Sequence, residues 1–358
     1  MNSFHKIFFV GVVILSIALG SRFNDTSGAN GILPTSIVIS AADEKPPVKD
    51  PSPDEIVQQS APNNSTTPNS IKVEEQPDAS KNQNDNSKTI LDNSALLKAD
   101  QSSERDAFRR TGSAQAPDIQ AQAAIVADLK TGQTYFESNQ NLRWPTASLT
   151  KLMTAIMVLK NMDLSKPVKI GDTLSGDGEA SSSASFFKPG DAYSGNDVLN
   201  TMLVISKNEA AEAFANAYGR DDFIAGLNKL AGELGMNLTN FSDPSGLSVS
   251  NQSTIADFQK LAMDVYQNYP KILEITRKKS VTVTELNSKK RTTLLNINIF
   301  AGASGFVGGK TGYTDEADGN LLSIFSYENR PVLVIVLGTA DRFGETSRLL
   351  QWFKDNFK

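Results

Sequence analysis

Two residues in the chain have the types and spacing of a serine nucleophile and its base. Ser148 stands three residues before Lys151, and the segment 152–159 that follows is apolar nearly all round, which is typical of a buried helix. Residues three apart share one face of a helix, so the hydroxyl and the amine can form a hydrogen bond. The helix N-terminus would stabilise an alkoxide at Ser148, and burial would lower the pKa of Lys151 toward that of a useful base.

The amino-acid composition leaves this pair few competitors. The 358 residues include no cysteine and a single histidine, His5, at the extreme N-terminus. A Cys–His nucleophile, a Cys/His zinc site and a Ser-His-Asp triad are therefore excluded from the folded part of the chain. The net charge is −5 and no run of Lys and Arg is interleaved with aromatics, which argues against nucleic-acid binding. We also expect no metal site and no cofactor.

Two further motifs carry groups that a peptide-cleaving site needs. Ser206 and Asn208 fall between two helical patterns, where a loop can point a hydroxyl and an amide into a cleft, although the ordinary interpretation is a helix cap. Lys310 and Thr311 precede Gly312 in a segment with a strand pattern. A lysine and a hydroxyl together would bind a carboxylate, and the glycine would let a peptide lie against the strand edge.

Ser-x-x-Lys, Ser-x-Asn and Lys-Thr-Gly, in this order, resemble the signature of penicillin-binding proteins and serine β-lactamases. The flanking segments 145–155, 243–247 and 309–314 resemble, more narrowly, the D-alanyl-D-alanine carboxypeptidases, which are low-molecular-weight penicillin-binding proteins. The similarity extends over about residues 121–357. It implies a transpeptidase-like α+β fold, an antiparallel sheet flanked by helices with a helical subdomain.

The resemblance also implies an activity and a partner. A peptidoglycan stem peptide ending in D-Ala-D-Ala would acylate Ser148, and β-lactam antibiotics would act as inhibitors. Lys151 would take the serine proton, Ser206 would help to relay it to the leaving D-Ala, and Asn208 would hold the substrate backbone and the lysine.

Five more residues would bind the substrate if the resemblance holds. Lys310 and Thr311 would hold the terminal carboxylate, with Gly312 giving the peptide room beside the strand. The backbone N–H groups of the nucleophile and of Tyr313 would form the oxyanion hole. Arg342 would be a second carboxylate contact.

The chain departs from the family pattern in two places. The family often has a histidine after the Pro-Ser-Gly-Leu motif, where this chain reads Asn251-Gln252-Ser253-Thr254, so any role of that histidine is absent. The sequence also ends at Lys358, directly after a helical pattern. We therefore expect any membrane attachment to come from the N-terminus.

Three alternatives remain beside a carboxypeptidase. A serine β-lactamase needs a deacylating base, and Glu233 and Asn237 have the spacing of a Glu-x-x-x-Asn loop, but Glu233 ends a helical pattern and is expected to be a solvated helix residue. A peptidoglycan endopeptidase would use the same motifs. A non-catalytic cell-wall-binding module could retain the fold without activity.

The N-terminal third of the chain is expected to be a targeting segment and a tether. Residues 1–42 contain the uncharged run 7–20, whose length suits a signal peptide or a short membrane anchor, with cleavage after Gly20 or after Ala42 as alternatives. Residues 43–118 hold eight of the fifteen prolines and one aromatic residue, which predicts a disordered tether. The rest of the protein is expected outside the cytoplasm.

Residues 119–358 are expected to form the catalytic domain. Apolar runs on either side of short polar turns predict one hairpin over 121–137 and another over 320–337. The sequence has helical patterns at 148–161, 196–205, 209–218, 221–234, 253–266 and 343–357. Strands at both ends with helices between them predict a single sheet assembled from sequence-distant segments, and hence an α+β fold.

Overall fold

The structure is a computed structural model that describes residues 36–38, 107–171 and 186–358. The expected signal or anchor segment and most of the expected tether lie outside these ranges. Among the described residues, none of the helices has the length and apolar character needed to cross a membrane.

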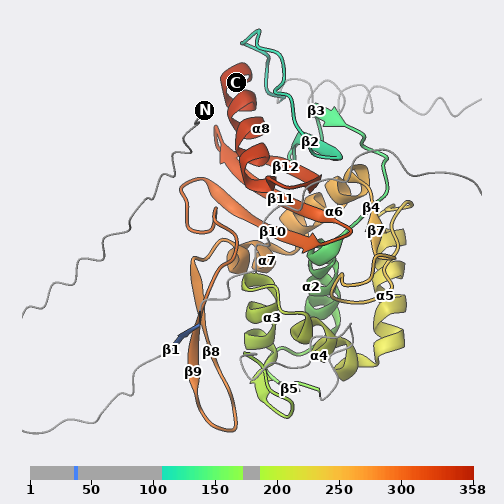
Figure 1. Cartoon of the computed structure of the whole chain (residues 1–358), viewed down its shortest axis with the longest axis vertical. Coiled ribbons are helices and arrows are strands. Elements are labelled where there is room, and N and C mark those ends of the chain that lie inside the picture. The colour runs from blue at the N-terminus through green and yellow to red at the C-terminus, as the bar shows by residue number, and fades with distance from the viewer. Residues whose placement is uncertain (1–35, 39–106, 172–185) are drawn as a thin grey trace, which may run out of the picture. The chain divides into compact units, whose positions relative to one another are not determined.

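A five-stranded antiparallel sheet joins the two ends of the catalytic domain (Figure 1). In the order β10-β11-β12-β2-β3 its strands are Phe306–Thr314, Asp318–Tyr327, Arg330–Thr339, Ala123–Asp128 and Thr134–Ser138. The first hairpin, β2–β3, pairs with the last, β11–β12, through β12, where Ile335 lies opposite Ile125. The expectation of one sheet built from sequence-distant hairpins, and of an α+β fold, is confirmed.

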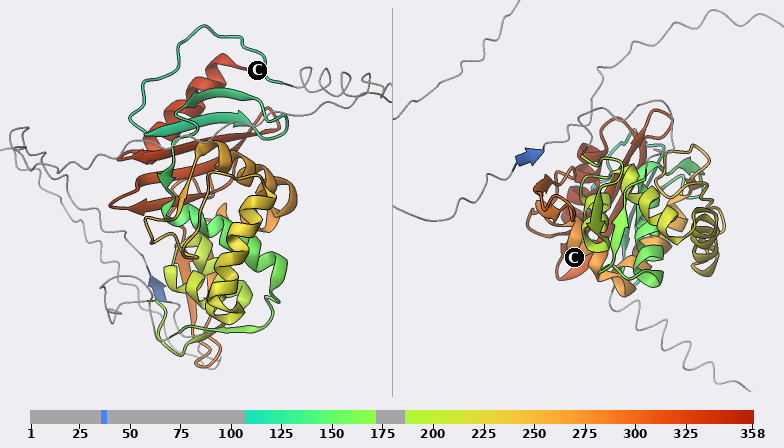
Figure 2. Two further views of the ribbon diagram at one scale, coloured as in Figure 1. Left: turned by 90° about the vertical axis from the view of Figure 1, so that its right-hand side faces the viewer. Right: turned by 90° about the horizontal axis from the view of Figure 1, so that it is seen from below.

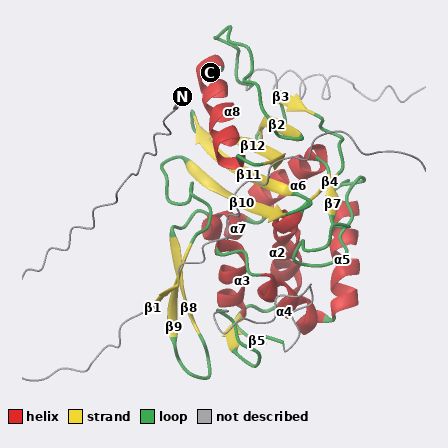
Figure 3. Cartoon of the chain, viewed as in Figure 1, coloured by secondary structure: helices red, strands yellow, loops and turns green. Residues whose placement is uncertain are grey.

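Alternate residues of the central strands enter two different hydrophobic cores. Along β2, Ile125 packs into the core shared with most of the helices, whereas Val126 packs into the core beneath α8 (Arg342–Asn356). Side chains alternate across a strand, so a strand buried on both faces supplies both cores at once. Figure 3 shows the sheet between α8 and the remaining helices.

The helical region lies on the opposite face of the sheet from α8 (Figure 2). It consists of α2 (Thr150–Asn161), α3 (Gly195–Val204), α4 (Asn208–Tyr218), α5 (Arg220–Glu233), α6 (Ile255–Asn268) and α7 (Pro270–Thr276). Nine consecutive residues of α2, from Thr150 to Val158, are buried. This is the all-round burial that an apolar run predicts, and it makes α2 the central helix of the region.

The described residues also form three smaller sheets. β4 (Trp144–Pro145) pairs with β7 (Gln252–Ser253), and β5 (Pro167–Lys169) pairs with β6 (Ala192–Ser194). The hairpin of β8 (Ser280–Thr284) and β9 (Arg291–Leu295) carries β1 (Ser36–Val38) as a parallel third strand. The β4–β7 pair lies nearest to Ser148 in the sequence, because β4 leads directly into the turn Ala147–Leu149.

The packed part of the described chain begins before residue 119, the start expected for the catalytic domain. Residues 107–118 were assigned to the tether, yet Phe108 is only 5% exposed and packs edge-on against Phe353. Arg109 and Lys358 exchange two backbone hydrogen bonds of 2.7 and 3.0 Å. Composition predicts disorder from average polarity, and a single aromatic residue that finds a buried position escapes such an average.

Candidate active site

Ser148, the expected nucleophile, lies in a 3₁₀ turn, Ala147–Leu149, placed just before α2. The helix predicted to begin at Ser148 therefore becomes α-helical only at Thr150. Ala147 has φ of 45°, a left-handed conformation that costs a non-glycine residue energy and is found at functional sites. The turn presents Ser148 at the entrance to the buried helix.

Two glycines from distant segments close around this turn. A Cβ atom on Gly246 would lie 1.8 Å from the carbonyl oxygen of Ala147, so the loop can approach only because residue 246 has no side chain. A Cβ atom on Gly312 of β10 would lie 3.2 Å from the backbone nitrogen of Ser148. The Lys-Thr-Gly strand and the segment after Asp243 thus both pack closely against the turn that carries Ser148.

Lys151 lies at the centre of the polar contacts. Its Nζ lies 2.8 Å from Ser148 Oγ, 2.7 Å from Asn208 Oδ1 and 2.6 Å from the carbonyl oxygen of Ser245. The residue is 0% exposed. The spacing argument for the serine–lysine pair is therefore matched by a hydrogen bond, and Asn208 of the second motif joins them.

Burial lowers the pKa of Lys151 from its usual 10.5 to about 7. Removing water penalises the ammonium form, because a charge in a dry interior loses its hydration. The carboxylates of Asp243, Glu209 and Glu212 act in the opposite direction, since negative charge favours the ammonium. The balance leaves a lysine that is substantially neutral near neutral pH, as a general base must be.

This pKa predicts the pH dependence of acylation. Only the neutral amine accepts the serine proton, so kcat/KM should rise as the pH increases through about 7 and level off above it. The measurement is the second-order rate constant for acylation by a chromogenic penicillin between pH 5 and pH 9. A flat profile from pH 6 to pH 8 would contradict the assignment of Lys151 as the titrating base.

The third motif forms a second cluster with Ser206. Lys310 Nζ lies 2.7 Å from Ser206 Oγ and 2.8 Å from the carbonyl oxygen of Thr311, and Lys310 is 1% exposed. Ser206 has φ of 60°, a second left-handed residue at the site. Burial, and then the positive charges of Lys151 and Arg342, lower the pKa of Lys310 well below its ordinary value. Such a site electrostatically favours an incoming anion.

The remaining predicted residues lie at the end of β10 and the start of α8. Tyr313 follows Gly312, and its side chain is 56% exposed. Arg342 is the first residue of α8, and a Cβ atom on Gly319 would lie 3.4 Å from its Nη1. Gly319 pairs with Tyr313 across β10–β11, so Arg342 lies at the strand end nearest Ser148.

Sequence analysis missed the part played by residues 242–251. The carbonyl of Ser245 contacts the lysine, and Asn251 fixes the same loop through bonds to Thr150 Oγ1 and the carbonyl of Asp243. The Asp-Pro-Ser-Gly-Leu motif was recognisable, but as a family similarity only. A backbone carbonyl belongs to every residue, so no residue type signals its use.

The β-lactamase alternative gains no support from Glu233. This residue ends α5 and forms surface ion pairs with Lys160 and Lys229. Lys160 lies nine residues after Lys151, which is about 13 Å along the axis of α2. Glu233 is therefore bound at the end of α2 that lies away from the nucleophile.

Comparison with known proteins decides the family. A family model described as D-alanyl-D-alanine carboxypeptidase matches residues 110–341. The chain belongs to this family of serine peptidases. The sequence resemblance is therefore confirmed across the catalytic domain.

Curated members of the family with similar sequences carry two kinds of name. The D-alanyl-D-alanine endopeptidase of Escherichia coli K12 is 32% identical over 246 residues, which cover 66% of this chain and 78% of that protein. The D-alanyl-D-alanine carboxypeptidase DacC of the same organism is 31% identical over 264 residues, covering 69% of this chain and 64% of that protein.

Solved structures of penicillin-binding proteins share the fold. A D-alanyl-D-alanine carboxypeptidase from Mycobacterium tuberculosis H37Rv superimposes with a TM-score of 0.61 at 27% identity, covering 69% of this chain and 95% of that chain. Penicillin-binding protein D2 of Listeria monocytogenes, in an ampicillin-bound form, gives 0.58 at 31% identity, covering 66% and 98%. The expected transpeptidase-like fold of this D-alanyl-D-alanine carboxypeptidase family member is confirmed.

Proposed function

We propose that the protein removes the terminal D-Ala from peptidoglycan stem peptides through an acyl-enzyme on Ser148. The observation that carries the proposal is the short contact of Ser148 Oγ with a fully buried lysine whose pKa is lowered to about 7. A serine hydroxyl is a weak nucleophile unless a neighbouring base accepts its proton. In the described part of the chain the lysine supplies the base that other peptidases take from histidine.

The acylation step follows from these contacts. Ser148 Oγ transfers its proton to the neutral amine of Lys151 and attacks the carbonyl carbon of the penultimate D-Ala. The backbone N–H groups of Ser148 and Tyr313 stabilise the oxyanion. The proton then passes from Lys151, with help from Ser206, to the nitrogen of the leaving D-Ala. Water hydrolyses the resulting ester and regenerates Ser148.

The terminal carboxylate of the substrate binds Lys310, Thr311 and Arg342. Burial disfavours the protonated form of Lys310 in the free protein, and so do Arg342 and Lys151 whenever they carry a positive charge. An incoming carboxylate reverses that balance, because an opposite charge within hydrogen-bonding distance restores the ammonium. Asn208 and the edge of β10 hold the peptide backbone in an extended conformation.

Replacing Lys310 tests the carboxylate contact. Lys310→Met should lower kcat/KM for a D-Ala-D-Ala peptide by roughly 10²-fold, since a hydrogen bond to a charged group is lost. The wild type should prefer the free acid to the peptide amide, and the variant should lose most of that preference. Lys169→Met, an exposed lysine on β5, is the matched control. An unchanged acid-to-amide ratio in Lys310→Met would refute the contact.

A second candidate function is cleavage of peptide cross-links. It is favoured by the endopeptidase name of the relative that is 32% identical. Both reactions acylate the serine with the same D-alanyl group and differ only in the leaving amine. Purified protein should be given a monomeric pentapeptide and a cross-linked dimer in equal amounts. Faster consumption of the dimer would make this an endopeptidase.

Reaction with penicillin tests the proposed function directly. Penicillin-binding protein D2 was solved with ampicillin and with cefotaxime bound. We expect this chain to form a stable penicilloyl ester that peptide mass spectrometry maps to Ser148, and to release D-Ala from a D-Ala-D-Ala peptide. Failure of both reactions would favour a cell-wall-binding module, and rapid turnover of penicillin without D-Ala release would favour a β-lactamase.

The site of action proposed for the enzyme is the extracytoplasmic cell envelope, where peptidoglycan lies. The uncharged run 7–20 supports export and either cleavage or retention as an N-terminal anchor. Fractionation of cells that express the full chain, followed by N-terminal sequencing, separates the two. A mature N-terminus after residue 20 or 42 would exclude the anchor.

A further inference from the structure

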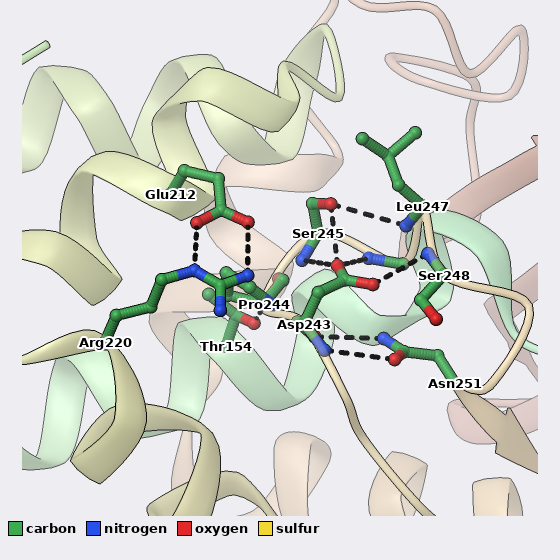
Figure 4. A network of polar contacts seen from close by, with 10 residues as sticks. Thr154, Glu212, Arg220, Asp243, Pro244, Ser245, Leu247, Ser248 and Asn251 are labelled. Carbon is green, nitrogen blue, oxygen red and sulfur yellow. Dashed lines mark hydrogen bonds and ion pairs between the residues drawn. The ribbon is translucent and has the colours of Figure 1, made fainter. Parts of the chain in front are cut away.

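Asp243 organises the loop behind the general base. Its Oδ1 accepts hydrogen bonds from Ser245 N at 2.7 Å, Ser245 Oγ at 2.7 Å and Gly246 N at 2.6 Å. Its Oδ2 accepts one from Ser248 N at 2.7 Å. The residue is only 7% exposed, and Figure 4 shows its carboxylate enclosed by the loop. A buried carboxylate with four donors is fully satisfied and holds the loop in one conformation.

The ordered loop aims two successive carbonyl groups at one face of α2. The carbonyl of Pro244 accepts a bond of 2.6 Å from Thr154 Oγ1, and the carbonyl of Ser245 lies 2.6 Å from Lys151 Nζ. Lys151 and Thr154 are three residues apart and so share a helix face. The carbonyl of Ser245 therefore contacts the lysine because the Asp243 turn places it there.

This carbonyl completes the orientation of a neutral amine. A neutral lysine has two N–H bonds and one lone pair, and two of its three neighbours, Asn208 Oδ1 and the Ser245 carbonyl, can only accept. Both N–H bonds are used by these acceptors. The lone pair is left facing the third neighbour, Ser148 Oγ, at 2.8 Å. A base oriented in this way can take the serine proton without first rotating.

We propose that Asp243 is a positioning residue for the general base, which it orients by fixing the Ser245 carbonyl on Lys151. This inference rests on the proposed acylation of Ser148. Asp243 reaches the reacting atoms only through Lys151, so it is not itself catalytic.

The charge of Asp243 also acts on Lys151, together with charges from other elements. Glu209 and Glu212 of α4 favour the ammonium form, as Asp243 does. On β10, the pKa of Lys310 is lowered first by burial and then by the positive charges of Lys151 and Arg342. Glu212 is paired with Arg220, whose own pKa is raised first by that bond and also by Asp243. Figure 4 shows the Glu212–Arg220 pair in the same region as the loop.

Asp243→Asn tests the proposal, because it keeps the shape and removes the charge. The second-order rate of penicillin acylation should fall about tenfold, the cost of weakened bonds to a charged acceptor. The acidic limb of the pH profile should move to lower pH, by roughly 0.5 to 1 unit, because loss of a negative charge lowers the pKa of Lys151. A wild-type rate with an unmoved limb would overturn the inference.

Asn251→Ala is the matched control, because it loosens the same loop and keeps the carboxylate. It removes bonds to Ser242 N, Asp243 N and Thr150 Oγ1. The acylation rate of this variant should fall, but the acidic limb of its pH profile should not move to lower pH. Water admitted to Lys151 would raise the pKa of the lysine. If Asn251→Ala also moves the limb to lower pH, the shift in Asp243→Asn does not come from the lost charge, and the predicted effect of Asp243 on the pKa of Lys151 is refuted.

Asp243→Glu keeps the inference testable if the asparagine variant does not fold. The longer side chain retains the charge but displaces the loop, so the rate should fall while the limb stays at or above its wild-type pH. A wild-type rate in Asp243→Glu would overturn the positioning role. A wild-type protein that reacts with neither penicillin nor D-Ala-D-Ala refutes the proposed function instead, so the two failures are distinguishable.

Discussion

Ser148→Ala should abolish release of D-Ala and covalent labelling by penicillin while leaving the fold intact. We expect D-Ala release to fall by about 10⁴-fold or more, because Ser148 is the hydroxyl in contact with the buried base and removal of a peptidase serine has effects of this size. The hydroxyl contributes one hydrogen bond to Lys151, so the free energy of unfolding should change little when it is removed. D-Ala release by a coupled assay and intact-protein mass spectrometry measure the two losses.

Ser250→Ala is the control for the serine replacement. Ser250 is exposed in the neighbouring loop and should retain wild-type activity. A penicilloyl adduct of undiminished yield in Ser148→Ala would show that another residue is the nucleophile, and the assignment of the site would then be wrong.

Lys151→Met should lower the acylation rate by about 10³- to 10⁴-fold, the upper range for loss of a general base. Methionine has a similar length and fills the buried position, but it has no lone pair that can accept the Ser148 proton. Ser148 then remains a weak nucleophile, so the variant should bind substrate with little turnover. Lys160→Met, at the solvent-exposed end of the same helix, should retain activity within about twofold.

The same variant has a distinct stability signature. The pKa of Lys151 is about 7 in the folded protein and near 10.5 when the chain unfolds, so between these values the unfolded chain binds more protons. The free energy of unfolding of the wild type should therefore receive a contribution that rises from pH 7 to pH 9. Lys151→Met should lack that rise. Urea unfolding of both proteins at pH 7, 8 and 9 measures it, and parallel curves would argue against a depressed lysine pKa.

Sequence patterns predicted the parts of the site that depend on side-chain type. Ser148, Lys151, Asn208 and Lys310 were assigned because only certain side chains can act as nucleophile, base or carboxylate ligand. The structure brings them within hydrogen-bonding distance of one another or of Ser206. The paired hairpins were predictable too, because apolar alternation and turn residues are local signals.

The parts that could not be predicted depend on backbone conformation. The left-handed φ of Ala147 has no signature, since alanine rarely adopts it and tertiary contacts impose it here. The Ser245 carbonyl is an ordinary peptide group that becomes functional through the turn around Asp243. The β8–β9 hairpin did carry a strand signal, because 280–284 alternates valine with threonine or serine. No feature of that sequence indicated where the hairpin packs.

The backbone pairing of Arg109 with Lys358 is placed to resist a force that pulls on the N-terminal side of the chain. A pull on the chain before residue 107 is first resisted by those two backbone bonds and by the Phe108 ring, which packs against Tyr327, Tyr135 and Phe353. These groups belong to the core beneath α8, whereas α2 and its lysine belong to the core on the other face of the sheet. Such a force would therefore detach the segment around Phe108 from α8 before it strained the region around Ser148.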